Sequence, residues 1–184
     1  MTSTEKSWNE WQREHHPSTA SSPVVERFRV CRSDLDLHRY MGVWYELARY
    51  PTFFEPEHAK NIVAEYSMTQ EFEDILVKNS MELDGERIFI TGTASFDRRF
   101  FSREKGQDQT KLLVDFAQGY PAQYWILCVD ENYQTALVGN ESKNNLWILS
   151  RQKSIPCFQY QKLLYILTHQ FGYDVNQLIP TQQT

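Results

Sequence analysis

Few side chains in this sequence have the neighbours that covalent catalysis requires. Cys128 lies in an alternating apolar stretch and would be the nucleophile of an isomerase or a peroxidase, but a thiol needs a nearby base to lower its pKa, and no histidine is evident on its face of the strand. Ser150 stands beside Arg151, but no catalytic motif supplies a histidine that could act as its base. The sequence also has no Gly-rich phosphate loop. We therefore predict no catalytic residue; a catalyst built on Cys128 or Glu46 is the alternative.

Metal ligands are equally sparse. His15 and His16 are adjacent, but no further ligand stands at a spacing typical of a metal site, and such a pair is most often solvated. The sequence predicts neither a metal ion nor a cofactor.

Glu46 is the sharpest candidate for a polar group inside the fold. Period-two alternation places it on the same face as Trp44, which we interpret as the inner face of a strand. A carboxylate that faces an apolar interior is costly unless it is hydrogen-bonded, solvated or protonated. Glu46 therefore either faces a ligand or bonds to Tyr66 or Tyr124, and the sequence leaves both open.

The alternating patterns of their own segments do not explain why a large ring stands at Trp44 or why a charged side chain stands at Arg151. Trp44 follows Gly42 at the start of an alternating segment, and Arg151 takes the inner-face position that ends another. A charge at such a position is costly without a partner. A guanidinium stacked on an indole resolves both problems. We predict that Gly42, Trp44 and Arg151 form the closed end of the fold.

Short alternating segments recur along the chain at the spacing typical of an all-β protein. Asp84-Gly85 marks one hairpin turn between them. The predicted strands are 42–50, 60–68, 73–82, 86–96, 111–117, 123–130, 134–139 and 145–151. They predict an eight-stranded antiparallel up-and-down barrel. A longer connection, residues 97–110, carries Arg98, Phe100 and Arg103, and we interpret it as a surface insertion.

Residues 157–171 predict one amphipathic helix, with Pro156 at its start and Gly172 just past its end. Its apolar face consists of Tyr160, Leu163, Leu164, Leu167 and Phe171. The first and last strands carry apolar residues on their outer faces, so we expect the helix to pack outside them.

The inner faces of the strands supply the candidates for a ligand-binding wall. The candidates are Glu46, Tyr66, Asn79, Val114, Tyr124, Ile126, Trp147 and Leu149. Each aromatic among them could also be ordinary core. The same alternation places Ala48, Ile88, Ile90 and Cys128 on inner faces. Phe53 and Phe54 fall between the first two predicted strands, in a loop that we expect at the open end of the barrel.

Three segments resemble the signature regions of the lipocalins. They are Gly42-Val-Trp-Tyr-Glu46, Val129-Asp-Glu-Asn-Tyr133 and Leu146-Trp-Ile-Leu-Ser-Arg151. Phe171-Gly-Tyr-Asp174 after the helix resembles the branch that contains bacterial outer-membrane lipocalins, apolipoprotein D and plant temperature-induced lipocalins. The resemblance covers the chain from about Asp34 to Pro180.

The resemblance implies a calyx that stores or carries a small hydrophobic or amphipathic ligand, such as a fatty acid or a lysophospholipid, and a link to stress response. The alternative is a packed barrel that acts as an interaction module through the 97–110 loop. Arg151 is expected to be the only inward arginine and to be occupied by Trp44. No fixed clamp for an anionic head group is therefore expected, and selectivity should depend mainly on chain length and shape.

Composition bounds the remaining possibilities. Lys and Arg number 19 against 24 acidic residues, so no basic field favours nucleic acid. Residues 1–33 predict a flexible polar arm, and residues 34–184 a single domain. Because the arm lacks the apolar stretch of a signal peptide, we expect a cytoplasmic or peripheral membrane location rather than secretion. A Cys31–Cys157 disulfide is conceivable, but reduced thiols are expected.

Overall fold

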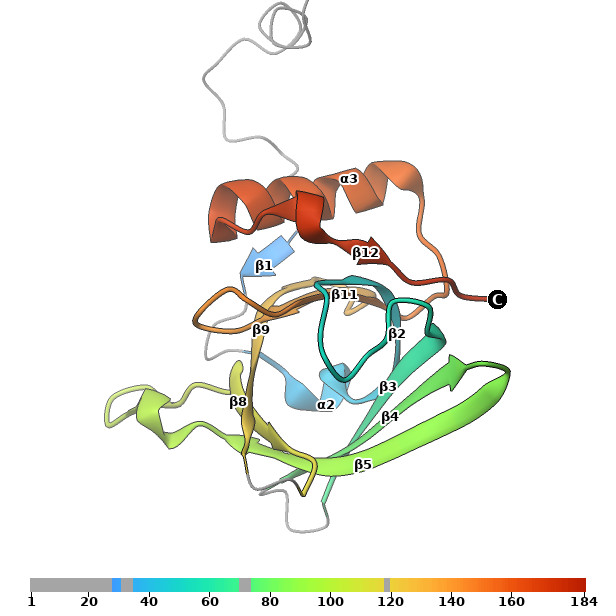
Figure 1. Cartoon of the computed structure of the whole chain (residues 1–184). Coiled ribbons are helices and arrows are strands. Elements are labelled where there is room, and N and C mark those ends of the chain that lie inside the picture. The colour runs from blue at the N-terminus through green and yellow to red at the C-terminus, as the bar shows by residue number, and fades with distance from the viewer. Residues whose placement is uncertain (1–27, 31–34, 70–73, 118–119) are drawn as a thin grey trace, which may run out of the picture.

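The chain folds as a closed antiparallel β-barrel with one long helix outside it (Figure 1). The computed structural model describes residues 28–30, 35–69, 74–117 and 120–184. The barrel strands are β2 Gly42–Arg49, β3 Lys60–Met68, β4 Ile75–Leu83, β5 Glu86–Phe96, β8 Lys111–Asp115, β9 Ala122–Asp130, β10 Thr135–Gly139 and β11 Leu146–Ser150. Pairing of β8 with β9, and of β11 with β2, closes the sheet. The eight predicted strands and the barrel are confirmed.

One end of the barrel is closed around Trp44, which is fully buried. The guanidinium carbon of Arg151 lies 3.8 Å from the centroid of the Trp44 ring. The same guanidinium donates hydrogen bonds to the carbonyl oxygens of Val43 (2.7 Å) and Met41 (2.7 Å). Gly42 has a φ of +95°, and a Cβ there would stand 3.4 Å from Arg151. The positive φ favours glycine at this position, and the guanidinium of Arg151 packs directly against it.

The Val129–Tyr133 segment meets the other two signature segments at this end. Helix α2, Leu37–Tyr40, crosses the opening, and the Arg39 guanidinium lies 4.1 Å above the Tyr133 ring. The Arg151 Nε also donates to the Tyr133 carbonyl (3.3 Å). Residues far apart in the sequence are therefore joined through one arginine and its backbone acceptors.

Helix α3, Cys157–Ile166, lies outside the barrel and continues into a π-helical turn, Leu167–Phe171 (Figure 1). Leu163, Ile166 and Leu167 are buried against the outer faces of the strands. Gly172 ends the helix in the left-handed conformation, with a φ of 68°. The predicted helix, its position and its glycine stop are confirmed.

The segment after the helix is fastened to the strand end. The Tyr173 hydroxyl donates to the carbonyl of Asn140 and accepts from its N–H, both at 3.2 Å. A Cβ at Gly139 would lie 2.1 Å from this hydroxyl, so no larger residue fits there while Tyr173 keeps its place.

Two predicted inner residues face outward instead, because a β-bulge shifts the alternation in each strand. The β11–β2 register shifts between Ile148 and Leu149, and Ala48 consequently packs under α3. The β10–β9 register shifts between Leu137 and Val138, and Cys128 likewise joins the cluster beneath the helix. The predictions that Ala48 and Cys128 face the interior were wrong.

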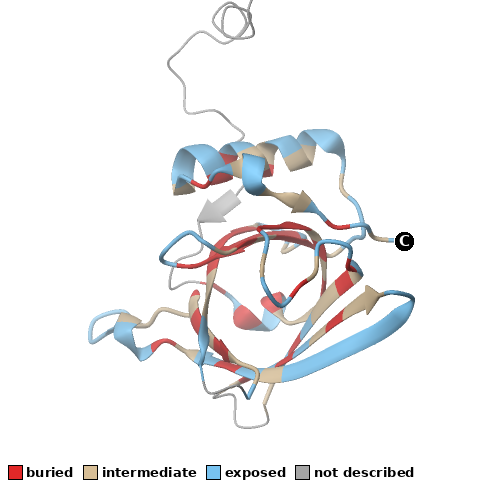
Figure 2. Ribbon diagram, in the orientation of Figure 1, coloured by how far each residue is buried: buried red, intermediate tan, exposed pale blue. Residues whose placement is uncertain are grey.

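The prediction for Ile88 and Ile90 was also wrong. They are 41% and 37% exposed, since β8 pairs only with residues 93–96 of β5. Figure 2 shows the preceding part of the strand as the exposed arm of the β4–β5 hairpin. Asp84 and Gly85 form its turn with φ values of 52° and 85°, as the dipeptide predicts.

Shorter elements complete the fold. Strand β1, Phe28–Val30, pairs with β9. It belongs to residues 1–33, the segment that the sequence predicts to be a flexible polar arm. The other residues of that segment lie outside the described ranges. The 97–110 insertion holds the 3-10 helix η2, Arg98–Phe100, and the hairpin β6, Phe101–Ser102, with β7, Gly106–Gln107. The 3-10 helix η4, Val175–Gln177, precedes strand β12, Ile179–Pro180. Within the described ranges, no helix has the length and apolar character needed to cross a membrane.

We expect the free energy of unfolding to reveal coupling between Trp44 and Arg151. Trp44→Ala should cost ~3–5 kcal/mol as a large-to-small core change, and Arg151→Ala about 2 kcal/mol through lost stacking and hydrogen bonds. Chemical denaturation of both single variants and the double variant measures the coupling, which should be about 1 kcal/mol. Strict additivity would contradict the stack.

Candidate functional site

The barrel encloses a cavity on the side away from the Trp44 end. Its enclosed volume is about 80 Å³, and the space with the open mouth included is about 650 Å³. The wall is mainly apolar and consists of Glu46, Phe54, Glu55, Ile62, Val63, Ala64, Tyr66, Val77, Asn79, Val114, Phe116, Ala122, Gln123, Tyr124, Trp147 and Leu149. The enclosed space is narrow for a cavity that binds a drug-sized ligand.

Seven of the eight predicted wall residues line this cavity: Glu46, Tyr66, Asn79, Val114, Tyr124, Trp147 and Leu149. Ile126 does not; it is fully buried in the core cluster. Phe54 reaches the cavity from the loop after β2, whereas Phe53 is 96% exposed and meets Phe54 edge to face at 5.1 Å.

A chain of tyrosine hydroxyls lies between the cavity and the closed end. Tyr66 donates to Tyr124 (2.9 Å), and the hydroxyls of Tyr124 and Tyr40 share a hydrogen bond of 2.7 Å. Burial raises the pKa of Tyr66 and of Tyr124 well above the ordinary value. Both therefore remain neutral hydroxyls that bond to each other rather than to Glu46.

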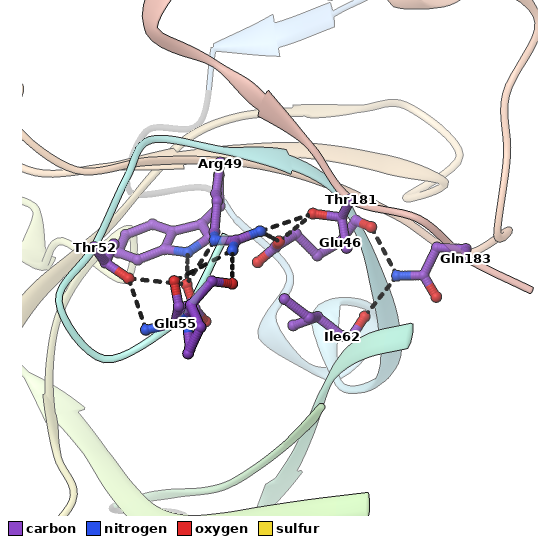
Figure 3. A network of polar contacts seen from close by, with 9 residues as sticks. Glu46, Arg49, Thr52, Glu55, Ile62, Thr181 and Gln183 are labelled. Atoms are coloured by element: carbon purple, nitrogen blue, oxygen red, sulfur yellow. Dashed lines mark hydrogen bonds and ion pairs between the residues drawn. The ribbon is translucent and has the colours of Figure 1, made fainter. Parts of the chain in front are cut away.

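Arg49 is a residue of the buried polar network that the sequence analysis missed. Its side chain is 0% exposed, because the bulge in β2 turns it to the side of its neighbour Trp147 rather than to solvent. Its guanidinium donates to Glu46 Oε1 (3.0 Å) and to the carbonyl oxygens of Glu55 (3.2 Å) and Pro56 (2.6 Å), as Figure 3 shows. The expectation that Arg151 is the only inward arginine was therefore wrong.

Glu55 is the second buried acid of this network. Its Oε2 accepts a hydrogen bond from Trp147 Nε1 (3.2 Å) and lies 3.6 Å from Arg49 Nε (Figure 3). Burial raises the pKa of Glu55, and the hydrogen bond from Trp147 opposes that effect. Trp147 thus both forms part of the wall and holds a carboxyl at the cavity.

The segment after η4 completes the network from outside the barrel. β12 pairs with β2 opposite Arg49 and Ala48, and the Thr181 hydroxyl donates to Glu46 Oε1. The Gln183 amide donates to the carbonyl oxygens of Glu46 and Ile62, both at 2.8 Å, and so bridges β2 and β3 (Figure 3). This bridge lies beyond Tyr45–Val63, the last β2–β3 pair toward the open end.

The charges of this network do not balance if every group is ionised. Arg49 supplies one positive charge, whereas Glu46 and Glu55 supply two carboxyls. Burial, followed by the charge of Glu55, raises the pKa of Glu46 to about 8, although Thr181 and Arg49 oppose the rise. One of the two carboxyls therefore keeps its proton near neutral pH.

The structure does not support Cys128 as the nucleophile of the alternative, in which Cys128 or Glu46 would be catalytic. Cys128 is buried under α3, so it does not face the cavity. Cys157 is exposed at the start of α3, whereas Cys31 lies outside the described residues. In the part of the chain that the structure describes, no group of three or more His, Cys, Asp or Glu side chains is arranged to hold a metal ion.

A family model described as a lipocalin-like domain matches residues 35–183. The chain belongs to the lipocalin family. It is 40% identical over 152 residues to a lipocalin of Acanthamoeba polyphaga mimivirus, covering 82% of this chain and 86% of that one. It is 33% identical over 157 residues to temperature-induced lipocalin-1 of Arabidopsis thaliana, covering 82% and 80%. Insecticyanin of the tobacco hornworm Manduca sexta shares the fold with a TM-score of 0.65 at 20% identity, covering 85% and 89%.

The resemblance to the branch of plant, bacterial and apolipoprotein D lipocalins is confirmed. Outer membrane lipoprotein Blc of Escherichia coli and apolipoprotein D of Oryctolagus cuniculus also match, at 29% and 30% identity. Lipocalins are known for binding and transporting small hydrophobic ligands, which makes the cavity the natural candidate site.

We expect the stability of the protein to fall as pH rises from 4.5 to 8, because folded Glu46 keeps a proton that the unfolded chain has lost. Above pH 8 the contribution of Glu46 to the free energy of unfolding should be constant. Denaturant midpoints across and above this window, for wild type and Glu46→Gln, measure the effect. The difference between the two curves isolates the contribution of Glu46.

Glu65→Gln is the matched control, since Glu65 is an exposed carboxyl on the neighbouring strand β3. It should retain the wild-type pH profile. Identical profiles for Glu46→Gln and wild type would contradict a protonated Glu46.

Proposed function

We propose that this protein binds and carries a small amphipathic molecule with one linear apolar chain, the class that includes fatty acids and lysophospholipids. The observation that carries the proposal is a narrow, mainly apolar cavity inside a lipocalin barrel, with its few polar groups gathered around Glu46 and Glu55. Such a wall suits one chain plus a small head group.

The small enclosed volume of the cavity favours a linear chain over a broad ring system. Trp147, Tyr124 and Phe116 all line the cavity, and a linear chain can pass between their rings more easily than a flat polycyclic ligand can. Phe54 is 47% exposed and stands in the loop beside the mouth, where it can cover the outer part of a bound chain. We infer a binding protein rather than an enzyme, since the thiol considered as a nucleophile faces away from this space.

Saturable binding of fatty acids, lysolipids and retinoids to purified protein tests the proposal. Linear lipids should bind and quench the fluorescence of Trp147, which lines the cavity. Trp147→Ala should weaken binding roughly tenfold, since an aromatic contact of this size is worth about 1–2 kcal/mol. Trp147→Phe should abolish most of the quenching while it keeps an aromatic wall.

Trp125→Phe is the matched control. Trp125 packs on Phe100 outside the barrel, with ring centroids 5.4 Å apart, so its loss should leave the quenching intact. Absence of saturable binding by any lipid to folded protein would reject the carrier function and favour the packed interaction module.

A further inference from the structure

Three residues that line the cavity, Glu46, Glu55 and Asn79, each have a side-chain oxygen without a hydrogen-bond partner among the described residues. Glu46 and Glu55 are 2% and 6% exposed, and both line the cavity. The side-chain contacts of these two acids use Glu46 Oε1 and Glu55 Oε2, so each carboxyl has a second oxygen without a hydrogen bond to any described residue. Asn79 adds a buried Oδ1 that has no donor among the described residues. A ligand that donates hydrogen bonds would satisfy these oxygens.

The cavity wall also lacks a cation to receive an anionic head group. None of the described residues that line it is Lys, Arg or His. Arg49 is not among the residues that line the cavity. Its Nη1 and Nη2 donate to Glu46, Thr181, Glu55 and Pro56, whereas its Nε has no hydrogen-bond acceptor among the described residues and lies 3.6 Å from Glu55 Oε2. A carboxylate ligand at this place would meet two acids and no available counter-charge.

Aromatic rings stand next to the same carboxyls. Trp147 bonds directly to Glu55, and Phe54 precedes Glu55 in the loop; both rings line the cavity. Ring faces attract cations, and a carboxylate beside them adds a counter-charge. Acids and aromatic rings together are the chemistry that recognises an ammonium group.

We propose that the Glu46–Glu55 pair is a head-group site for amphiphiles that carry an ammonium group, which are preferred over free carboxylates of the same chain length. The proposal rests on the proposed function and ranks the ligands within it by head group. It replaces the sequence expectation of weak dependence on the head group.

Binding of an ammonium head supplies the positive charge that the network lacks. The charged and titratable groups that face Glu46 are Arg49, Glu55 and Tyr66. Only Arg49 among them is cationic, and it serves both carboxyls. A second cation allows Glu46 to ionise, so Glu46 releases its proton to solvent as the ligand binds. Affinity for the ammonium ligand should therefore rise with pH up to about 8, the pKa of Glu46.

Dodecylamine, dodecanol and dodecanoate, each below its aggregation limit, test the proposal by calorimetry. Dodecylamine should bind roughly tenfold or more tightly than dodecanoate, as expected for a charge-assisted hydrogen bond in a buried site. Titration in two buffers of different ionisation enthalpy should show proton release with dodecylamine and none with dodecanol. Glu46→Gln should remove the proton release and reduce the preference, whereas Glu65→Gln should change neither.

The neutral alcohol dodecanol distinguishes a failure of the head-group site from a failure of lipid binding as such. Saturable binding of dodecanol with no preference for dodecylamine over dodecanoate would overturn the head-group site and leave the proposed function standing. Failure of all three ligands to bind would reject the proposed function itself. If Glu46→Gln does not fold, the proton release and pH dependence of the wild-type protein decide the question.

Discussion

The open half of this barrel is organised around a guanidinium with no exposure to solvent. Burying a charge is costly, so the surroundings of Arg49 must supply acceptors from several directions. Glu46 comes from the same strand, Glu55 and Pro56 from the following loop, and Thr181 from the segment after the helix. These elements are held in one arrangement because loss of any of them would leave part of the charge unsatisfied.

The two ends of the barrel solve the problem of a buried arginine differently. At the closed end Arg151 covers Trp44 and uses backbone carbonyl oxygens as acceptors. These acceptors carry no net charge, so the arrangement is structural and does not respond to ordinary changes of pH. At the open end Arg49 meets carboxyls, and those carboxyls also face the cavity. The electrostatics of the open end are therefore coupled to whatever occupies the cavity.

The cavity follows from this division of the barrel. Tyrosine hydroxyls that bond to one another fill the space toward the closed end. Trp147 and Leu149, two residues apart on β11, form part of the wall in the other half. We propose that the apolar wall accommodates a chain and that the acids and aromatic rings beside it discriminate between head groups.

The sequence by itself determined the strands, the helix and its glycine stop, the Trp44–Arg151 stack and seven of the sixteen residues of the cavity wall. Those features depend on local periodicity or on paired residues whose costs must cancel, and both can be recognised in a sequence. Tertiary structure alone decided the faces of Ala48, Arg49 and Cys128. A single extra residue in a strand reverses the alternation between inward and outward side chains beyond that point. The residue types of β2 are compatible with either orientation, so the sequence does not reveal the bulge.

The buried network was beyond sequence reasoning for a related reason. Glu46 was identified as an inward acid, but its partners were expected to be tyrosines. Its actual partners, Arg49 and Thr181, are brought together by the bulge and by a segment that pairs with β2 after the helix. The energy of a buried charge depends on all groups within a few ångströms, and only the folded chain specifies which groups those are.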